Sequence, residues 1–122
     1  MKTNKFRVWD KNKKEIRKVT GINWYDEYLW VDETPMSGDK LPIESTPLMQ
    51  FTGFTDKNGK EIYDGDIVTV RFSDGSGYDN PVEVSFENGS FWAGMGYLND
   101  VKIIEVVGNI FQNPELLIKN NK

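Results

Sequence analysis

The 122-residue sequence contains no cysteine and no histidine. Without these residues the chain can form no disulfide, no Cys/His zinc site and no Ser-His-Asp or Cys-His catalytic group. It also lacks the side chain that most often transfers protons near neutral pH. We therefore predict a protein that is not an enzyme, and we identify no catalytic, cofactor-binding or metal-binding residue. The absence of cysteine also fits a reducing cytoplasm.

Long apolar runs are also missing. No run approaches the roughly 18 residues that a membrane-spanning helix needs. The opening residues, MKTNKFRVWDKNKK, are charged and no apolar stretch follows them, which argues against a signal peptide. Both observations predict a cytoplasmic chain that does not contact a membrane. Aromatic residues make up 13% of the sequence, enough to give a chain of this length a core.

Basic residues are concentrated at the start of the chain. Residues 1–20 carry eight lysines or arginines and two acids, whereas the net charge of the whole chain is −4. Such asymmetry can indicate a contact with nucleic acid. We favour a basic hairpin that is solvated or lies against the acidic remainder, because a DNA-binding protein usually presents an overall basic face. The residues of this hairpin that could contact phosphates are Lys11, Lys13, Lys14, Arg17 and Lys18.

Alternating and β-branched residues predict strands along nearly the whole chain. The expected strands are FRVWD (6–10), EIRKVTGINW (15–24), EYLWVDE (27–33), LMQFTGF (48–54), KEIY (60–63), DIVTVRF (66–72), two arms around an Asn88-Gly89 turn, and VKIIEVVGNIF (101–111). Asn113, Pro114 and Glu115 predict the start of a short C-terminal helix that ends at Leu117. The residues expected to be largely buried are Phe6, Val8, Phe51, Ile67, Val70, Val84, Phe86, Ile104 and Val106.

The sequence also indicates a boundary between two modules. Residues 33–47, ETPMSGDKLPIESTP, hold three prolines and few apolar residues, which is typical of a long connection. We therefore expect an N-terminal β-hairpin module with its linker at residues 1–46. A second β module should follow at residues 47–118, and residues 119–122 form a polar tail.

The stretch DKNGKEIYDGD (56–66) is the part of the chain that most resembles a metal site. An EF-hand calcium loop needs acidic or amide ligands at fixed positions, but Lys60, Glu61 and Ile67 occupy three of the positions that matter. Asn58-Gly59 is a strong signal for a two-residue type I′ hairpin. We therefore interpret the stretch as turns between strands. Residues 10–16, DKNKKEI, differ from residues 56–62, DKNGKEI, at one position, and turn chemistry alone can produce this match.

Two groups of aromatic residues could form a binding surface. Trp24, Tyr25, Tyr28 and Trp30 follow one another too closely to face a single core, so some should be exposed or lie at a subunit interface. Phe91, Trp92 and Tyr97 could stack on bases or on a peptide, but we favour a place in the core for them. The candidate interaction surface therefore combines the basic hairpin with Trp24, Tyr28, Trp30, Phe91, Trp92 and Tyr97.

Three segments together resemble the YopX family, small proteins encoded by phages and prophages of mostly Gram-positive bacteria. The segments are FRVWDKNKKEI (6–16), LMQFTGFTDKNGKEIYDGDIV (48–68) and EVVGNIFQNPELL (105–117). The resemblance implies an irregular coiled β-sheet in the N-terminal part and a small SH3-like β-barrel in the C-terminal part. It implies no activity and no catalytic or binding residue. Residues 20–45 and 73–100 lie outside these segments.

These observations predict a mainly β, phage- or prophage-encoded accessory protein in the host cytoplasm. We expect it to act as a non-catalytic protein-interaction module that binds a host or phage protein, with self-association as a further possibility. The alternative is a nucleic-acid-associated protein that uses the basic N-terminal hairpin.

Overall fold

The computed structural model describes residues 5–32, 38–72, 81–94, 96–97 and 101–118. These residues form a mainly β protein, in which every strand pair is antiparallel. The elements are β1 (Phe6–Asp10), β2 (Glu15–Asn23), β3 (Tyr28–Val31), β4 (Asp39–Pro42), β5 (Leu48–Thr55), β6 (Glu61–Tyr63), β7 (Asp66–Phe72), β8 (Val82–Glu87), β9 (Ser90–Ala93), β10 (Gly96–Tyr97), β11 (Val101–Asn109) and α1 (Glu115–Ile118). No helix of this described part is long and apolar enough to cross a bilayer. The predicted β class and the short C-terminal helix are confirmed.

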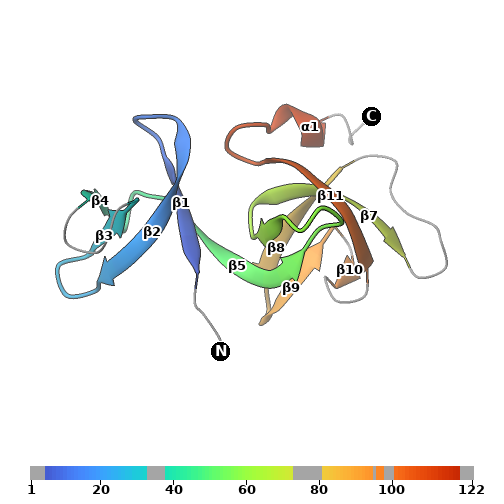
Figure 1. Ribbon diagram of the computed structural model, residues 1–122, viewed down its shortest axis with the longest axis horizontal. Helices are drawn as coiled ribbons and strands as arrows, with labels where there is room; N and C mark the ends of the chain where they lie inside the picture. Colours follow the sequence, from blue (N-terminus) through green and yellow to red (C-terminus); the bar gives the residue numbers. More distant parts are fainter. Residues whose placement is uncertain (1–4, 33–37, 73–80, 95, 98–100, 119–122) are drawn as a thin grey trace. The chain divides into compact units, whose positions relative to one another are not determined.

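The chain forms two compact units, Met1–Gln50 and Phe51–Lys122, so the division falls inside β5. In the first unit the strand order is β4-β3-β2-β1-β5 (Figure 1). Val8, Leu29 and Val31 form its buried core, and alternate residues of β3 point away from that core because side chains along a strand alternate between faces. Tyr28 and Trp30 therefore share the outer face of β3.

Strand β4 lies within the segment that the sequence predicts to be a connection. It pairs along its whole length with β3, from Val31 opposite Asp39 to Tyr28 opposite Pro42. Its residues are mostly exposed, and Pro42 is tolerated because β4 is an edge strand with a side that needs no ladder bonds. A strand that buries so little apolar surface leaves no periodic signal in its sequence.

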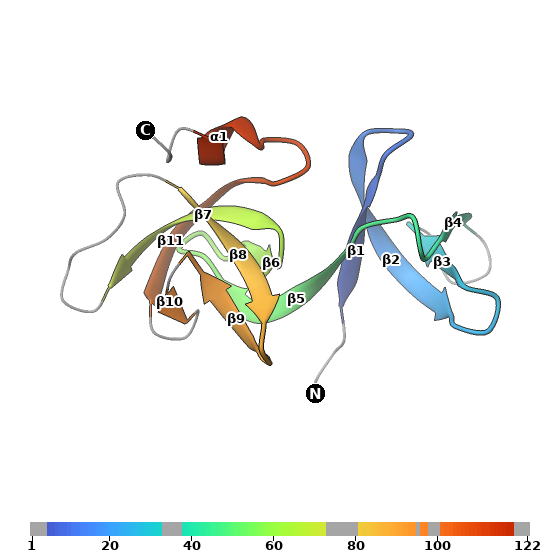
Figure 2. The same cartoon turned by 180° about the vertical axis from the view of Figure 1, so that it is seen from behind.

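The second unit contains a sheet with the order β10-β9-β8-β7-β11, and β6 pairs with β5 (Figure 2). Its buried core consists of Ile62, Val68, Val70, Val84 and Ala93. Among the described residues the five-stranded sheet is open at β10 and β11, so the SH3-like barrel is not confirmed.

The expected core is confirmed at four positions and changed at others. Val8, Ile67, Val70 and Val84 are completely buried, while Phe6, Phe51 and Val106 are half-buried. Phe86 is 49% exposed, which corrects the prediction that it is buried. It lies just before the tip of the β8–β9 hairpin, and its ring contacts the ring of Phe91. The side chain of Ile104 lies outside the described part of the structure.

The two Asn-Gly turns differ. At Asn88-Gly89 both residues have positive φ, 54° and 81°, and Glu87 pairs with Ser90, so the predicted two-residue type I′ hairpin is confirmed. At Asn58-Gly59 only the glycine has a positive φ, 82°. That turn is longer, because the N–H of Asp56 donates to the carbonyl oxygen of Lys60. The type I′ prediction is therefore wrong for residues 58 and 59, although the segment does form a turn.

Candidate functional site

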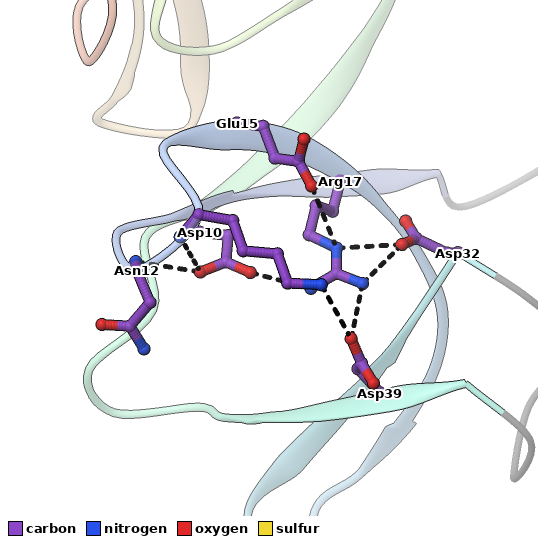
Figure 3. A network of polar contacts seen from close by, with 7 residues as sticks. Asp10, Asn12, Glu15, Arg17, Asp32 and Asp39 are labelled. Atoms are coloured by element: carbon purple, nitrogen blue, oxygen red, sulfur yellow. Dashed lines mark hydrogen bonds and ion pairs between the residues drawn. The ribbon is translucent and has the colours of Figure 1, made fainter.

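Arg17, on β2, is buried at the centre of a group of carboxylates, with 6% of its side chain exposed (Figure 3). Its Nη1 donates to Oδ2 of Asp10 at 2.8 Å. Its Nε and Nη2 both donate to Oδ2 of Asp32, at 2.9 and 2.6 Å, and Nη2 also donates to Oδ2 of Asp39 at 2.8 Å. The carboxylate of Glu15 lies 4.0 Å from Nε. One guanidinium thus joins residues of β1, β2 and β4 and the residue that follows β3.

These contacts fix the charges of the group. The hydrogen bond from Arg17 is the main reason why the pKa of Asp10 lies below its usual value, and this bond outweighs the effect of burial. The pKa of Asp39 is also lowered, again chiefly by Arg17. Hydrogen bonds to Asp32 and Asp39 raise the pKa of Arg17 further above its already high value. Asp10, Asp39 and Arg17 therefore remain charged near neutral pH, which suits a structural role better than proton transfer.

The network corrects the place of Arg17 in the candidate surface. A guanidinium that is buried and bound to three carboxylates cannot contact a phosphate. Arg17 is therefore not part of the basic surface. Lys11, Lys13, Lys14 and Lys18 are exposed as expected. The Nζ of Lys13, however, lies 3.5 Å from the same oxygen of Asp39. The hairpin is therefore less basic than its sequence indicates.

The turn between β2 and β3 exposes two adjacent large aromatic side chains. Trp24 is 69% exposed and Tyr25 is 94% exposed. The turn itself is held by Asn23, whose Oδ1 accepts a hydrogen bond from the N–H of Asp26 at 2.9 Å. The Nδ2 of Asn23 also donates to the hydroxyl of Tyr28 at 3.3 Å. The exposed rings are thus presented by a braced turn, and the prediction that part of this cluster is exposed is confirmed.

Tyr28 and Trp30 follow the turn, on the outer face of β3. Their rings meet edge to face, with centroids 5.3 Å apart and planes at 85°. The Nζ of Lys40, on β4, lies 4.7 Å from the ring centroid of Tyr28 and 5.5 Å from that of Trp30. A cation above aromatic rings is attracted by their negative faces. These half-buried rings are therefore fixed in place on β3, the strand that follows the turn.

A hollow of about 590 Å³ lies next to Trp24 in the first unit. It is lined by Phe6 and by five residues of the segment that ends at Trp24, namely Val19, Thr20, Gly21, Ile22 and Trp24 itself. Four of these residues follow one another along β2, and side chains of a strand alternate between faces. The hollow therefore lies beside the C-terminal half of β2, with Phe6 and Trp24 as aromatic walls.

Two of the three candidate aromatics of the second unit, Phe91 and Trp92, lie on its β8–β9 hairpin, and Tyr97 belongs to β10. Phe91 and Trp92 are half-buried, on opposite faces of β9. The ring of Phe91 packs on Phe86 with centroids 4.8 Å apart, and Nε1 of Trp92 donates to the carbonyl oxygen of Glu87 at 3.1 Å. The side chain of Tyr97 lies outside the described residues. Phe86 extends this group as a further surface residue. Its sequence position predicts burial, because it continues the alternation of the buried Val84.

Two acidic residues of DKNGKEIYDGD, Asp56 and Asp66, have structural roles. Asp56 is buried, and its Oδ1 accepts hydrogen bonds from the N–H groups of Asn58 and Lys60. Its Oδ2 accepts one from the N–H of Val106, on β11. Asp66 is also buried and accepts a hydrogen bond from the N–H of Tyr63. The described residues hold no group of three or more acids that could bind a metal ion.

The polar residues of the C-terminal segment are used in the same way. The Oδ1 of Asn109 accepts hydrogen bonds from the N–H groups of Phe111 and Gln112, at 3.0 and 2.9 Å. The Oδ1 of Asn113 accepts one from the N–H of Asn109, and a side chain at Gly108 would collide with that oxygen at 2.5 Å. Polar residues of the segments 6–16, 48–68 and 105–117 therefore stabilise turns and strand ends.

Comparison with known proteins places the chain in a family. No curated protein matches it. Among solved structures, it is similar to the crystal structure of protein EF1440 from Enterococcus faecalis, with 26% sequence identity and a TM-score of 0.63. That likeness covers 96% of this chain and 99% of the other. The sequence also matches the YopX protein family over residues 5–118, so this chain belongs to the YopX family.

Proposed function

We propose that this chain is a phage- or prophage-encoded accessory protein of the bacterial cytoplasm, and that it acts by binding a host or phage protein without catalysis. The binding surface is the aromatic surface of the first unit, formed by Trp24, Tyr25, Tyr28 and Trp30. The observation that carries this proposal is the exposure of Trp24 and Tyr25, 69% and 94%, on one braced turn.

Aromatic residues of this kind supply much of the energy of protein interfaces. Tryptophan and tyrosine are enriched among interface hot spots, because each buries a large rigid area at a small cost in conformational entropy. The neighbouring hollow, walled by Phe6 and Trp24, gives a partner side chain a place to insert beside the exposed rings.

The division of roles along the sequence also supports this proposal. Asp10, Asp56, Asp66 and Asn109 lie within the family segments, and their side chains bind other parts of the chain. Trp24 and Tyr25 lie between those segments, and most of their surface is open to solvent. We therefore infer that the family segments, including those of a small SH3-like second unit, build the scaffold. The intervening turn carries the binding specificity of this particular chain.

A tagged chain captured from a lysate of infected or lysogenic host, divided into nuclease-treated and untreated halves, tests this function. We expect a protein that is retained after nuclease treatment and lost when Trp24 and Tyr25 are both replaced by serine. Phe54→Ser is a matched control, because Phe54 is a 40% exposed aromatic residue of the second unit. Retention by the Trp24/Tyr25 variant would overturn the proposed surface.

The nuclease arm also tests the nucleic-acid alternative. For that alternative, four exposed lysines could contact nucleic acid, but Arg17 is held in the ion network. If capture disappears after nuclease treatment, and also disappears when Lys11, Lys14 and Lys18 are replaced by glutamine, the protein binds nucleic acid. Sedimentation of the purified chain separates both outcomes from self-association.

A further inference from the structure

Both Asn-Gly dipeptides of this chain, Asn58-Gly59 and Asn88-Gly89, lie in exposed hairpin turns. Asn-Gly is the dipeptide in which asparagine loses its side-chain amide nitrogen most easily, because glycine has no side chain to hinder attack by its own backbone nitrogen. The two sites share the same dipeptide and the same exposure. Their turns differ, and this difference determines their reactivity.

The reaction needs a free backbone nitrogen after the asparagine. The deprotonated nitrogen attacks the side-chain Cγ, a C–N bond forms to close a five-membered imide, and the amide nitrogen leaves as ammonia. Water then opens the imide at either carbonyl to give aspartate or isoaspartate. One water is consumed and one ammonia is released, with no change of oxidation state. A hydrogen bond from the attacking N–H opposes the first step, because that bond must break before the nitrogen can lose its proton and move.

At Asn58 the attacking nitrogen is restrained. The N–H of Gly59 donates to the carbonyl oxygen of Asp56 at 3.0 Å. The N–H groups of Asn58 and Lys60, on either side, donate to Oδ1 of the same aspartate at 2.8 and 3.0 Å. Asp56 is itself buried and fixed to β11 through Val106. Reaction at Asn58 therefore requires several hydrogen bonds to open together.

At Asn88 the attacking nitrogen has no such restraint. Asn88 and Gly89 are the two central residues of a type I′ turn, in which the only turn hydrogen bond closes between the flanking residues Glu87 and Ser90. Within the described part of the chain the N–H of Gly89 has no hydrogen-bond acceptor. Both residues are exposed, and the tip of a two-strand hairpin opens at little cost.

From this difference we propose that Asn88 is a site of spontaneous deamidation in the folded protein, whereas Asn58 is protected by its turn. The product at Asn88 is mainly isoaspartate, which lengthens the backbone by one carbon at the turn. A type I′ turn cannot absorb an extra atom without shifting the strands, so the Phe86–Phe91 contact beside it is disturbed. The isoaspartyl carboxylate is the substrate class of S-adenosylmethionine-dependent repair methyltransferases.

The test is to incubate the folded chain in mildly alkaline buffer, digest it, and follow both Asn-Gly peptides by mass spectrometry. An isoaspartyl methyltransferase with labelled S-adenosylmethionine reports isoaspartate independently. We expect conversion at Asn88 to be about tenfold faster than at Asn58, which corresponds to about 1.4 kcal/mol of additional opening free energy at residue 58. The Asn88→Gln variant should lose the methyl-accepting signal.

The same chain unfolded in urea is the internal control. There the two peptides share the same dipeptide without their turns, so their rates should become similar. Equal rates in the folded chain, or faster conversion at Asn58, would overturn the proposal. So would a folded chain in which neither peptide converts while both convert in urea.

Discussion

Nη1 of Arg17 donates a 2.8 Å hydrogen bond to Oδ2 of Asp10, and both side chains are almost completely buried. The other oxygen of Asp10 accepts hydrogen bonds from the N–H groups of Asn12 and Lys13, so this carboxylate connects the β1–β2 turn to the ion network. A buried pair of this kind contributes little net stability compared with apolar residues of the same size, but the loss of one partner is costly.

We therefore expect Arg17→Met to destabilise the first unit by about 3–5 kcal/mol, because Asp10 would keep a buried charge without a counter-ion. Urea unfolding followed by tryptophan fluorescence measures this, since Trp9, Trp24 and Trp30 lie in the first unit. The exposed Lys11→Met variant is the control and should change stability by less than about 0.5 kcal/mol. Adding Asp10→Asn to Arg17→Met should restore part of the loss, and strict additivity of the two changes would argue against the coupling.

The dependence of stability on pH should have a definite direction. Arg17 lowers the pKa of Asp10 and of Asp39 in the folded chain. Each therefore stabilises the fold above the unfolded pKa of about 3.9, and the contribution is lost as pH falls through the lower folded value. With no histidine in the chain, we expect no histidine-type step in the melting temperature near pH 6 to 7, and a fall in acidic buffer as Asp10 and Asp39 are protonated. A marked step near neutral pH would contradict this account.

Asp56→Ala should destabilise the second unit. Burial raises the pKa of Asp56, but hydrogen bonds from three backbone N–H groups outweigh it and leave the pKa below its usual value. Removing the carboxylate leaves those donors without their partner, at a cost of about 1–3 kcal/mol for each one that stays buried. Hydrogen exchange at Val106 and Lys60 should accelerate in this variant and stay unchanged in Lys57→Ala, whose side chain is exposed.

Val84→Ala and Phe86→Ala should differ sharply although the two residues share one face of β8. Val84 is completely buried, and its truncation leaves a cavity that we expect to cost about 2–4 kcal/mol. Phe86 is half exposed at the hairpin tip, so its truncation should cost less than about 1.5 kcal/mol, the scale of one aromatic pair contact. Thermal unfolding by circular dichroism compares them, and equal losses would place Phe86 in the core after all.

Glu83→Gln should stabilise the protein at neutral pH. Burial raises the pKa of Glu83, and the nearby charges of Glu87 and Asp64 raise it further. A carboxyl with a raised folded pKa stabilises the fold below its unfolded pKa, and that contribution is lost as pH rises through the folded value. The gain in melting temperature from Glu83→Gln should therefore shrink in acidic buffer. The exposed Glu105→Gln change serves as the control, and a gain that persists in acid would argue against this cause.

Much of the fold could be predicted because it is encoded in short stretches of sequence. Alternation of apolar and polar residues in β1, β3 and β8 predicted these strands, and Asn113-Pro114-Glu115 predicted the start of α1. The repeated DKN segments also share a local mechanism. Asp10 and Asp56 each use Oδ1 to accept two backbone N–H groups of their own turn, and each uses Oδ2 to bind a more distant donor.

The candidate surface was predicted only in part. Closely spaced aromatics in residues 24–30 indicated that some rings must be exposed, but which ones depends on where the turn between β2 and β3 falls. Tyr25 lies at that turn and is the most exposed of them, although the sequence offered no reason to prefer it over Tyr28. Phe86 was placed in the core because alternation continues to the end of a strand, even where the core beneath it stops.

The sequence by itself determined the β class, the turns, the family and the absence of cysteine and histidine chemistry, because each of these depends on residue type or on neighbours along the chain. Only the tertiary structure decided that Arg17 is buried and does not belong to the basic surface. Its carboxylate partners Asp10, Asp32 and Asp39 belong to separate parts of the sequence. Strand pairing brings them together, and a charged side chain can be buried only where such partners replace the water that it loses.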